Sequence, residues 1–315
     1  MWALPALAEP VRVATYNTGL SRDGPGLLLR DILRDAPQVQ AVAKVIASAA
    51  PDVILLQDVD YDAGLVAARA LRDRVRDFGH KLEHVFAFAP NTGVPSGFDL
   101  NSDGRSNGFA DAHGYGRYAG QAGMVLLSRF PIRHATDHSL KLWADWDGAD
   151  PAEIRAAWGD GGAHLRLAST GQWLVTLDLP SGQGLTLLAF HATPPVFDGP
   201  EDRNGLRNRD ELRFLAETTE GIDGYFILLG DANNDPQKGE GRNLGIKALL
   251  DNPRLSDPLK GMPTVDWRAL GLGWMRVDYI LPAKHLRIAD AGRYMASPAE
   301  QASRHRLTWV DIALP

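Results

Sequence analysis

Several short apolar runs of this chain each end on a polar side chain, and this pattern limits the fold more than any other feature of the sequence. The runs span residues 11–17, 53–58, 124–128, 185–191 and 225–231. Continuous apolar runs of this length, bounded by turn-forming residues, are typical of strands that are buried on both faces. We therefore expect the interior to be built from β-sheet that is covered on its outer sides.

Helical patterns separate several of these strands. Apolar side chains recur at helical spacing in residues 38–50, 62–79 and 208–221. Further strands are expected at 276–282 and 307–314, whereas 90–121 and 138–172 are irregular and rich in turn formers or tryptophan. Strands that alternate with helices predict sheets with helices on their outer faces. No linker divides the sequence, so residues 11–315 are predicted to form a single domain.

The first ten residues differ from the rest of the chain. Ala6 and Ala8 flank Leu7, which resembles the small-residue cleavage site of a secretory signal. We predict that residues 1–10 are the tail of a signal peptide and that the protein is periplasmic or extracellular. The alternative is a loose apolar N-terminus on a cytoplasmic protein. The chain has no cysteine, which excludes disulfides and thiolate metal sites, and no run is long enough to span a membrane.

The polar residues at the strand ends are the candidates for chemistry. A polar residue that follows a buried strand emerges at the edge of a sheet, where α/β proteins hold their binding crevices. Taken singly, each is more often a turn former or a structural side chain. As a set they favour one polar site, and the set is Asn17, Asp58, His191, Asp231, Asn233, Asp278 and, near the end of the chain, His305.

These residue types suit the hydrolysis of a phosphate ester. Asparagine and aspartate oxygens are hard ligands, which fit Mg²⁺, Mn²⁺ or Ca²⁺ better than zinc. Such a cation polarises a phosphoryl oxygen and offsets the charge that develops on it. A histidine can take a proton from water near neutral pH, and an aspartate behind it can orient its ring.

Five segments together resemble the endonuclease/exonuclease/phosphatase superfamily, which includes pancreatic-type deoxyribonuclease, abasic-site endonucleases, neutral sphingomyelinases and inositol-polyphosphate 5-phosphatases. The segments are PDVILLQDVD, AFHATPP, ILLGDANNDP, RVDYILP and SRH, in the family's order and preceded by VATYN. The resemblance covers nearly the whole chain, and ILLGDANNDP is its most specific part. It implies a four-layer α-β-β-α sandwich, in which two packed mixed β-sheets carry helices outside.

The resemblance also implies a metal site. Asn17 and Asp58 would hold Mg²⁺ or Mn²⁺, with Ca²⁺ as the alternative, and Asp231 would bind metal or position the attacking water. Two residues depart from the family pattern, because Asp58 stands in place of glutamate and Arg304 in place of aspartate. We therefore expect one metal, and we expect Arg304, together with Arg306, to bind a substrate phosphate unless it points away into a surface ion pair.

The same resemblance implies catalytic roles for four residues. His305 would be the general base, oriented by Asp278. His191 and Asn233 would stabilise the transition state, and His191 is also a candidate for protonating the leaving group.

Residues elsewhere are candidates for contact with an anionic substrate. Tyr118 lies near the place of a phosphate-contacting tyrosine in the family, and Arg117 beside it offers a forked donor; an ordinary glycine-rich loop is the alternative. Arg207 clusters with Arg203 and Arg209 near an expected helix start, which would either meet the substrate or form a solvated helix end.

One polar loop resembles the opening of a calcium loop. Asp99, Asn101 and Asp103 precede Gly104, although the twelfth position is Ala110 and no flanking helices are evident. A structural Ca²⁺ site and a loop with Asp-Gly turns are both possible. Four tryptophans are expected either to line a lid or stack bases, or to pack beneath a long insertion: Trp143, Trp146, Trp158 and Trp173.

The predicted function is a divalent-metal-dependent phosphoesterase of the phosphodiesterase or nuclease kind. Its substrate would be nucleic acid, a phospholipid head group or a small phosphate ester, and no protein partner is predicted. The net charge of -6 leans away from long duplex DNA. The alternatives are a phosphomonoesterase, a phospholipid head-group hydrolase, or a catalytically weakened binding module, the last suggested by Asp58 and Arg304.

Overall fold

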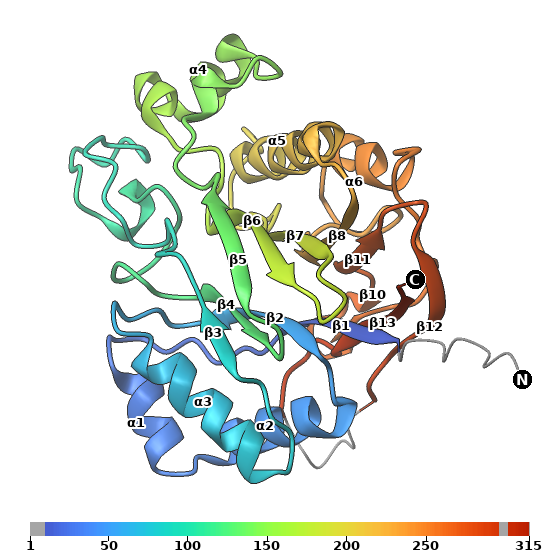
Figure 1. The fold of residues 1–315 in the computed structure, drawn as a ribbon. Helices are drawn as coiled ribbons and strands as arrows, with labels where there is room; N and C mark the ends of the chain where they lie inside the picture. Colours follow the sequence, from blue (N-terminus) through green and yellow to red (C-terminus); the bar gives the residue numbers. More distant parts are fainter. Residues whose placement is uncertain (1–9, 296–301, 315) are drawn as a thin grey trace, which may run out of the picture.

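Two mixed β-sheets form the centre of the molecule (Figure 1). The computed structural model describes residues 10–295 and 302–314, so residues 1–9 of the predicted signal-peptide tail lie outside the described residues. The first sheet has six strands in the order β12 (Arg287–Arg293), β13 (Thr308–Ala313), β1 (Val11–Asn17), β2 (Val53–Val59), β4 (Gly123–Ser128) and β3 (His84–Phe86). The second has five strands in the order β11 (Asp278–Pro282), β8 (Tyr225–Asp231), β7 (Gly184–His191), β6 (Gly171–Asp178) and β5 (Ile132–Asp137).

Helices cover the outer face of each sheet, so the predicted four-layer sandwich is confirmed (Figure 1). The six-stranded sheet carries α1 (Leu27–Leu33), α2 (Pro37–Ala49) and α3 (Val66–Asp77). The five-stranded sheet carries α5 (Arg203–Thr218) and α6 (Asn243–Leu250), and α4 (Pro151–Trp158) projects beside α5. Strands β9 (Val265–Trp267) and β10 (Gly273–Met275) pair as a small hairpin, which is a separate two-stranded sheet. Within the described ranges, no helix has the length and apolar character needed to cross a bilayer.

The strand β1 shows why the apolar runs are continuous. Successive side chains of a strand point to opposite faces of the sheet. Val13 packs into the core between the two sheets, whereas Ala14 and Tyr16 pack into the core beneath α2. Both faces of the strand are therefore buried, and both need apolar side chains.

Two edge strands and the start of one helix were not apparent in the sequence. The edge strands β5 and β12 are mostly exposed or half-buried, so they carry no continuous apolar run. Helix α5 begins at Arg203, five residues before the expected start at residue 208, because its first turns bury polar side chains instead of an apolar stripe.

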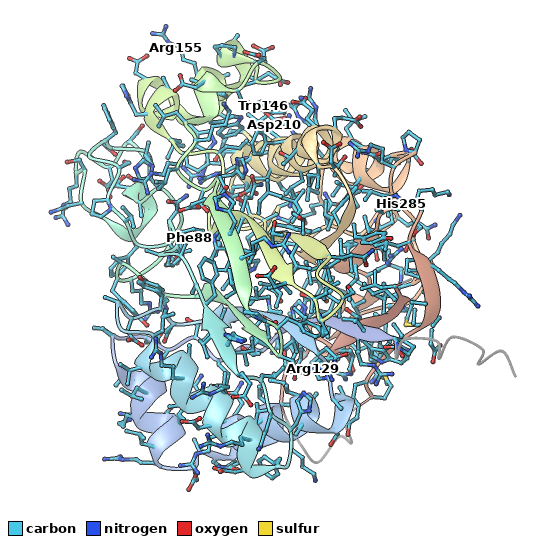
Figure 2. The ribbon with its side chains drawn as sticks, viewed as in Figure 1. Phe88, Arg129, Trp146, Arg155, Asp210 and His285 are labelled. Atoms are coloured by element: carbon cyan, nitrogen blue, oxygen red, sulfur yellow. The ribbon has the colours of Figure 1, made fainter. Side chains whose placement is uncertain are left out.

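The segment 138–172 is also more ordered than expected. It contains α4 and two 3-10 helical turns, and its tryptophans form a separate core with Leu206 of α5. Trp146 lies where this insertion meets α5 (Figure 2), and its Nε1 donates to Glu217 Oε2 at 2.7 Å. Trp143, Trp146, Trp158 and Trp173 are all buried, so core packing is their main role.

Candidate active site

Strand register brings three of the candidate residues to one edge. Strands β7 and β8 are parallel and pair His191 with Asp231, while β11 runs antiparallel to β8 and pairs Asp278 with Asp231. The first sheet delivers Asn17 from the end of β1, and its Nδ2 donates to Asp231 Oδ2 at 2.8 Å. The ends of the two sheets therefore meet at Asp231.

Asp231 is the centre of the polar cluster and is fully buried. Besides the bond from Asn17, its Oδ2 lies 3.7 Å from His191 Nε2 and 4.0 Å from His305 Nδ1. Its Oδ1 accepts a hydrogen bond from the backbone N–H of Asn233 at 2.8 Å. Side chains from residues 17, 191 and 305 thus meet on one carboxylate, as a single active site requires.

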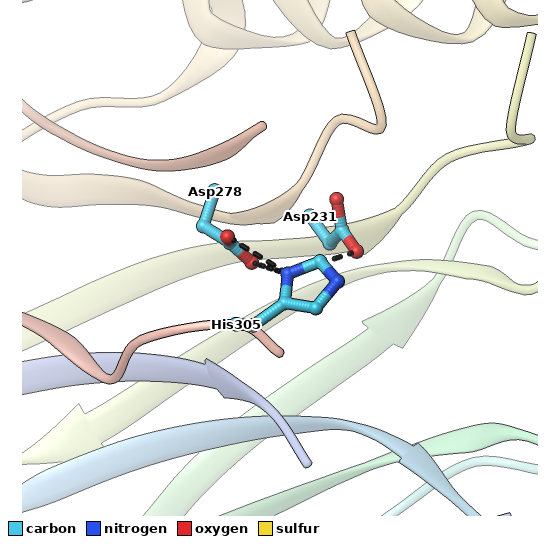
Figure 3. Close-up of side chains that lie close together, drawn as sticks. All are labelled: Asp231, Asp278 and His305. Carbon is cyan, nitrogen blue, oxygen red and sulfur yellow. Dashed lines mark hydrogen bonds and ion pairs between the residues drawn. The ribbon is translucent and has the colours of Figure 1, made fainter. Parts of the chain in front are cut away.

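His305 forms a pair with Asp278 (Figure 3). Its Nδ1 lies 2.9 and 3.1 Å from the two carboxylate oxygens of Asp278, and no described residue hydrogen-bonds its Nε2. Burial by itself would lower the pKa of His305, but the charges of Asp278, Asp231 and Asp58 outweigh burial and raise this pKa to about 9. Asp278 therefore orients the ring and leaves Nε2 as the atom that can exchange a proton.

Hydrogen bonds from Ser303 and Arg306 hold the loop that carries His305. Ser303 Oγ donates to the backbone carbonyl of Asn17 at 2.7 Å and accepts from the backbone N–H of His305 at 3.1 Å. Arg306 Nη1 donates to the carbonyls of Ser303 and Arg304, each at 3.0 Å, and of His305 at 3.2 Å. Its guanidinium carbon also lies 5.2 Å from the centre of the Trp274 ring. Arg306 is therefore occupied in holding the loop, and the prediction that it joins Arg304 in binding phosphate has no support in these contacts.

Two candidate residues adopt the left-handed backbone conformation. Asp58 has φ of 61° and Asn233 has φ of 51°. Asp58 lies where the pairing of β2 with β4 shifts register between Gln57 and Val59, and such a bulge redirects a side chain. Asp and Asn tolerate a positive φ better than most residues, so these residue types suit both positions.

The donor set fits a hard divalent cation. Burial raises the pKa of Asp58, Asp231 and Asp278, and a nearby cation would favour the charged form of all three carboxylates. The Asp58 carboxylate accepts no hydrogen bond from any described residue, and it faces the same cleft as Asn17. Ligand atoms of Asp231, Asp278 and His305 also lie within 4.8 Å of one another. Because His305 Nδ1 is already bonded to Asp278, we favour the Asn17 and Asp58 side of Asp231 for the cation.

A cleft of about 740 Å³ opens beside this cluster. Asn17, Asp58, His191 and Asn233 line one part of it. The remaining lining includes Thr193 and Pro194, Tyr115, Phe197 and Trp158, and the arginines Arg203 and Arg207. Among the predicted substrate contacts, only Arg207 lines the cleft.

Three predicted substrate contacts lie outside the cleft lining. Arg117 is exposed and its Nη1 lies 3.2 Å from Asp23 Oδ2. Tyr118 OH donates to the carbonyl of Arg22 at 3.3 Å, and burial raises its pKa. Arg304 is exposed, and its carbonyl accepts a hydrogen bond from the backbone of Asp266. Tyr115, three residues before Tyr118, lines the cleft.

Helix α5 holds the loops around the cleft with buried polar side chains. Asn208 Nδ2 donates to the carbonyls of Thr193 at 2.8 Å and Ala232 at 2.7 Å. These two carbonyls follow His191 and Asp231 by two residues and one residue, so Asn208 fixes both strand ends. Glu211 accepts hydrogen bonds from the backbone of Ser169 and Thr193, each at 2.6 Å. Sequence reasoning grouped Asn208 with the arginines at the helix start and did not predict that it holds these carbonyls.

The predicted calcium loop is folded on its own backbone. Asp99 accepts hydrogen bonds from the backbone N–H groups of Asp103 at 3.2 Å and Gly104 at 2.8 Å. Asn101 Nδ2 donates to Asp103 Oδ2 at 3.1 Å. The three candidate ligands are exposed and form Asp-Gly turn contacts, which the alternative interpretation requires.

The fold and the site define a two-sheet α/β sandwich with a His–Asp pair at the strand ends. The sequence matches the model of the Endonuclease/Exonuclease/phosphatase family over residues 14–305, and the chain belongs to this family. A comparison with curated proteins found no match.

Solved structures of the same family have this fold. An endonuclease/exonuclease/phosphatase from Beutenbergia cavernae is 19% identical, with a TM-score of 0.64 over 97% of this chain and 72% of that one. Sphingomyelinase C from Streptomyces griseocarneus is 17% identical, with a TM-score of 0.53 over 96% and 99% of the two chains. An AP endonuclease from Archaeoglobus fulgidus is 14% identical, with a TM-score of 0.55 over 96% and 100%. At these identities the likeness concerns the fold.

Proposed function

We propose that this protein hydrolyses phosphate esters with the help of a divalent cation held by Asn17 and Asp58. The observation that supports this most directly is the meeting of Asn17, His191 and His305 on the buried Asp231 carboxylate. Membership of the family and structural likeness to a sphingomyelinase and an AP endonuclease support the same class of reaction.

Each residue then has a role that follows from its contacts. His305, oriented by Asp278, would take a proton from the attacking water at Nε2 once a bound cation offsets the carboxylate charges that raise the pKa of its imidazole. Asp231 holds that water in place. His191 and Asn233 face the cleft and donate hydrogen bonds to the phosphoryl oxygens as their charge grows. Burial lowers the pKa of His191 to about 4, so at neutral pH we assign it hydrogen bonding in preference to protonation of the leaving group.

The cation would be Mg²⁺ or Mn²⁺, with Ca²⁺ as the alternative. When bound, it polarises a phosphoryl oxygen and offsets the developing negative charge. Asp58 is shorter than the family's glutamate, and its redirected backbone brings the carboxylate to the cleft despite that difference.

The test is the release of p-nitrophenol from bis-p-nitrophenyl phosphate. We expect hydrolysis with Mg²⁺ or Mn²⁺, its loss with a chelator, and its restoration by added metal. Hydrolysis of p-nitrophenyl phosphate instead would show a phosphomonoesterase. An absence of turnover on both esters with all three cations would contradict the proposal and favour a binding module.

We also propose that the protein is exported, on the strength of the Ala6-Leu7-Ala8 pattern. N-terminal sequencing of the protein from fractionated cells tests this. Recovery in the cytoplasmic fraction with the first eight residues intact would contradict it.

A further inference from the structure

Two arginines of α5 share one tryptophan of α4 in the lining of the cleft. Arg203 and Arg207 are one turn apart on α5, and their guanidinium carbons lie 5.1 and 5.9 Å from the centre of the Trp158 ring. Both arginines line the cleft. Like charges one turn apart on a helix repel each other, so this arrangement costs stability unless something anionic offsets it.

The carboxylates near these arginines offset their charge incompletely. Glu201 Oε1 lies 3.7 Å from Arg203 Nε, which is too far for a hydrogen bond. That Nε is buried and has no hydrogen-bond acceptor among the described residues. Glu211 stands near Arg207, but both of its oxygens already accept backbone hydrogen bonds.

Arg207 is held in place before any ligand arrives. It is 2% exposed, and its Nε and Nη2 donate to the carbonyls of Leu167 at 3.0 Å and Arg166 at 2.6 Å. Its Nη1 has no hydrogen-bond partner among the described residues. Burial lowers the pKa of Arg207 to about 10, so it remains charged at neutral pH. A fixed cation in a site of low dielectric binds an anion more strongly than a solvated one does.

We propose that the part of the cleft lined by Arg203 and Arg207 binds a second anionic group of the substrate. The substrate would then be a small phosphate ester with two anionic groups. This inference rests on the proposed function, since that function places the scissile ester at Asp58. Tyr115 and Phe197 also line the cleft and are 70% and 89% exposed, so they offer aromatic surface to the organic part of the ester. A head group whose second charge is positive, such as choline, is repelled by the two guanidinium groups.

A pair of chromogenic esters that differ by one phosphate tests the proposal. The esters are thymidine 5′-(p-nitrophenyl phosphate) with and without a 3′-phosphate, measured with the metal-loaded protein. We expect the 3′-phosphate to raise kcat/KM by about tenfold, as a charge-assisted contact should. Arg203→Gln should remove this gain, and it should raise the relative rate on p-nitrophenyl phosphorylcholine.

Arg213→Gln is the matched control. Arg213 lies on the same helix, and its guanidinium carbon is also 5.1 Å from a tryptophan ring, that of Trp146, but it does not line the cleft. The 3′-phosphate gain should survive in this variant. An equal loss in both variants, or no gain in the native protein, would overturn the proposal.

Calorimetric titration with thymidine 3′,5′-bisphosphate separates this inference from the proposed function. If neither ester is hydrolysed but the bisphosphate binds about tenfold more weakly to Arg203→Gln than to Arg213→Gln, the subsite stands and the proposed function fails. If both variants bind the bisphosphate as the native protein does, the subsite is wrong even when the esters are hydrolysed.

Discussion

The two halves of the cleft are built from different kinds of structure. The strand-end half is lined by Asn17, His191 and Asn233. These residues lie at or just after strand ends, and backbone pairing between strands sets their positions. The loop half is lined by Trp158 of α4 and Arg203 of α5. The loops beside these residues are held by side chains that bond to backbone carbonyls. The buried apolar side chains and the backbone bonds of the strands set the register, so we expect single polar residues at the strand ends to be replaceable without loss of shape. The second half depends on a few buried polar groups, each of which is costly to remove.

The largest expected effect is on chemistry in the strand-end half. His305→Ala should lower kcat/KM on bis-p-nitrophenyl phosphate on the order of 10³-fold, because the proton acceptor is lost. The variant should still fold, since the backbone of the loop keeps its bonds through Ser303 and Arg306. Asp278→Asn should also reduce turnover while the protein stays folded. Near-native turnover in His305→Ala would show that the general base lies elsewhere.

The next largest effect is expected from Asn208→Ala, which should lower both the free energy of unfolding and kcat. Asn208→Ala leaves the carbonyls of Thr193 and Ala232 without a donor, so we expect the free energy of unfolding to fall by about 2 to 4 kcal/mol. The loops after His191 and Asp231 should also loosen and reduce kcat. Urea unfolding and steady-state kinetics measure the two effects.

Asn252→Ala is the control for this prediction. Asn252 is half-buried and its Nδ2 donates to Thr219 Oγ1 at 3.0 Å, away from the cleft. Its replacement should lower stability but not kcat. Equal kcat in the two variants would show that α5 does not position the catalytic strand ends.

A smaller effect is expected from the loop that carries His305. Arg306→Met removes the donor to three successive carbonyls, so we expect kcat to fall by about tenfold through misplacement of the imidazole. Arg293→Met is the matched control, because Arg293 stacks on the same Trp274 ring at the same 5.2 Å but bonds none of these carbonyls. A loss in Arg293→Met as large as that in Arg306→Met would point to the tryptophan contact instead.

The smallest expected effect is on the pH dependence of the free energy of unfolding, through His113 near the loop half. Burial and the charges of Arg166 and Arg207 lower the pKa of His113 from 6.5 to about 4. As pH falls from 6.5 to 4, the unfolded chain takes up a proton here and the native chain does not, so the native state loses stability. His113→Gln should therefore flatten the pH dependence of the free energy of unfolding in this range. Exposed His134→Gln is the control, and the same flattening there would contradict the assignment to His113.

Much of the strand-end half could be predicted from the sequence. Apolar runs that are buried on both faces end where the sheet ends, so the polar residue that follows each run marks an edge. Asn17, His191 and Asp231 were found in this way, and the structure places them in contact through Asp231. The edge strands β5 and β12 escaped notice because one of their faces meets solvent and no apolar run is needed.

Little of the loop half could be predicted from the sequence, because contacts with residues far along the chain decide where its side chains lie. Nothing local distinguishes Arg207, which bonds to carbonyls in the insertion, from Arg117, which pairs with Asp23 at the surface. Arg306 differs in that its carbonyl partners lie in its own loop, although its guanidinium also packs on the distant Trp274 ring. The sequence by itself determined that sheets are covered by helices and which polar residues follow the strands, because hydrophobic periodicity is a local property, and the resemblance of its motifs to a known family supplied the four-layer sandwich. Only the tertiary structure decided which arginines face the cleft, because the direction of a long side chain depends on what packs around it.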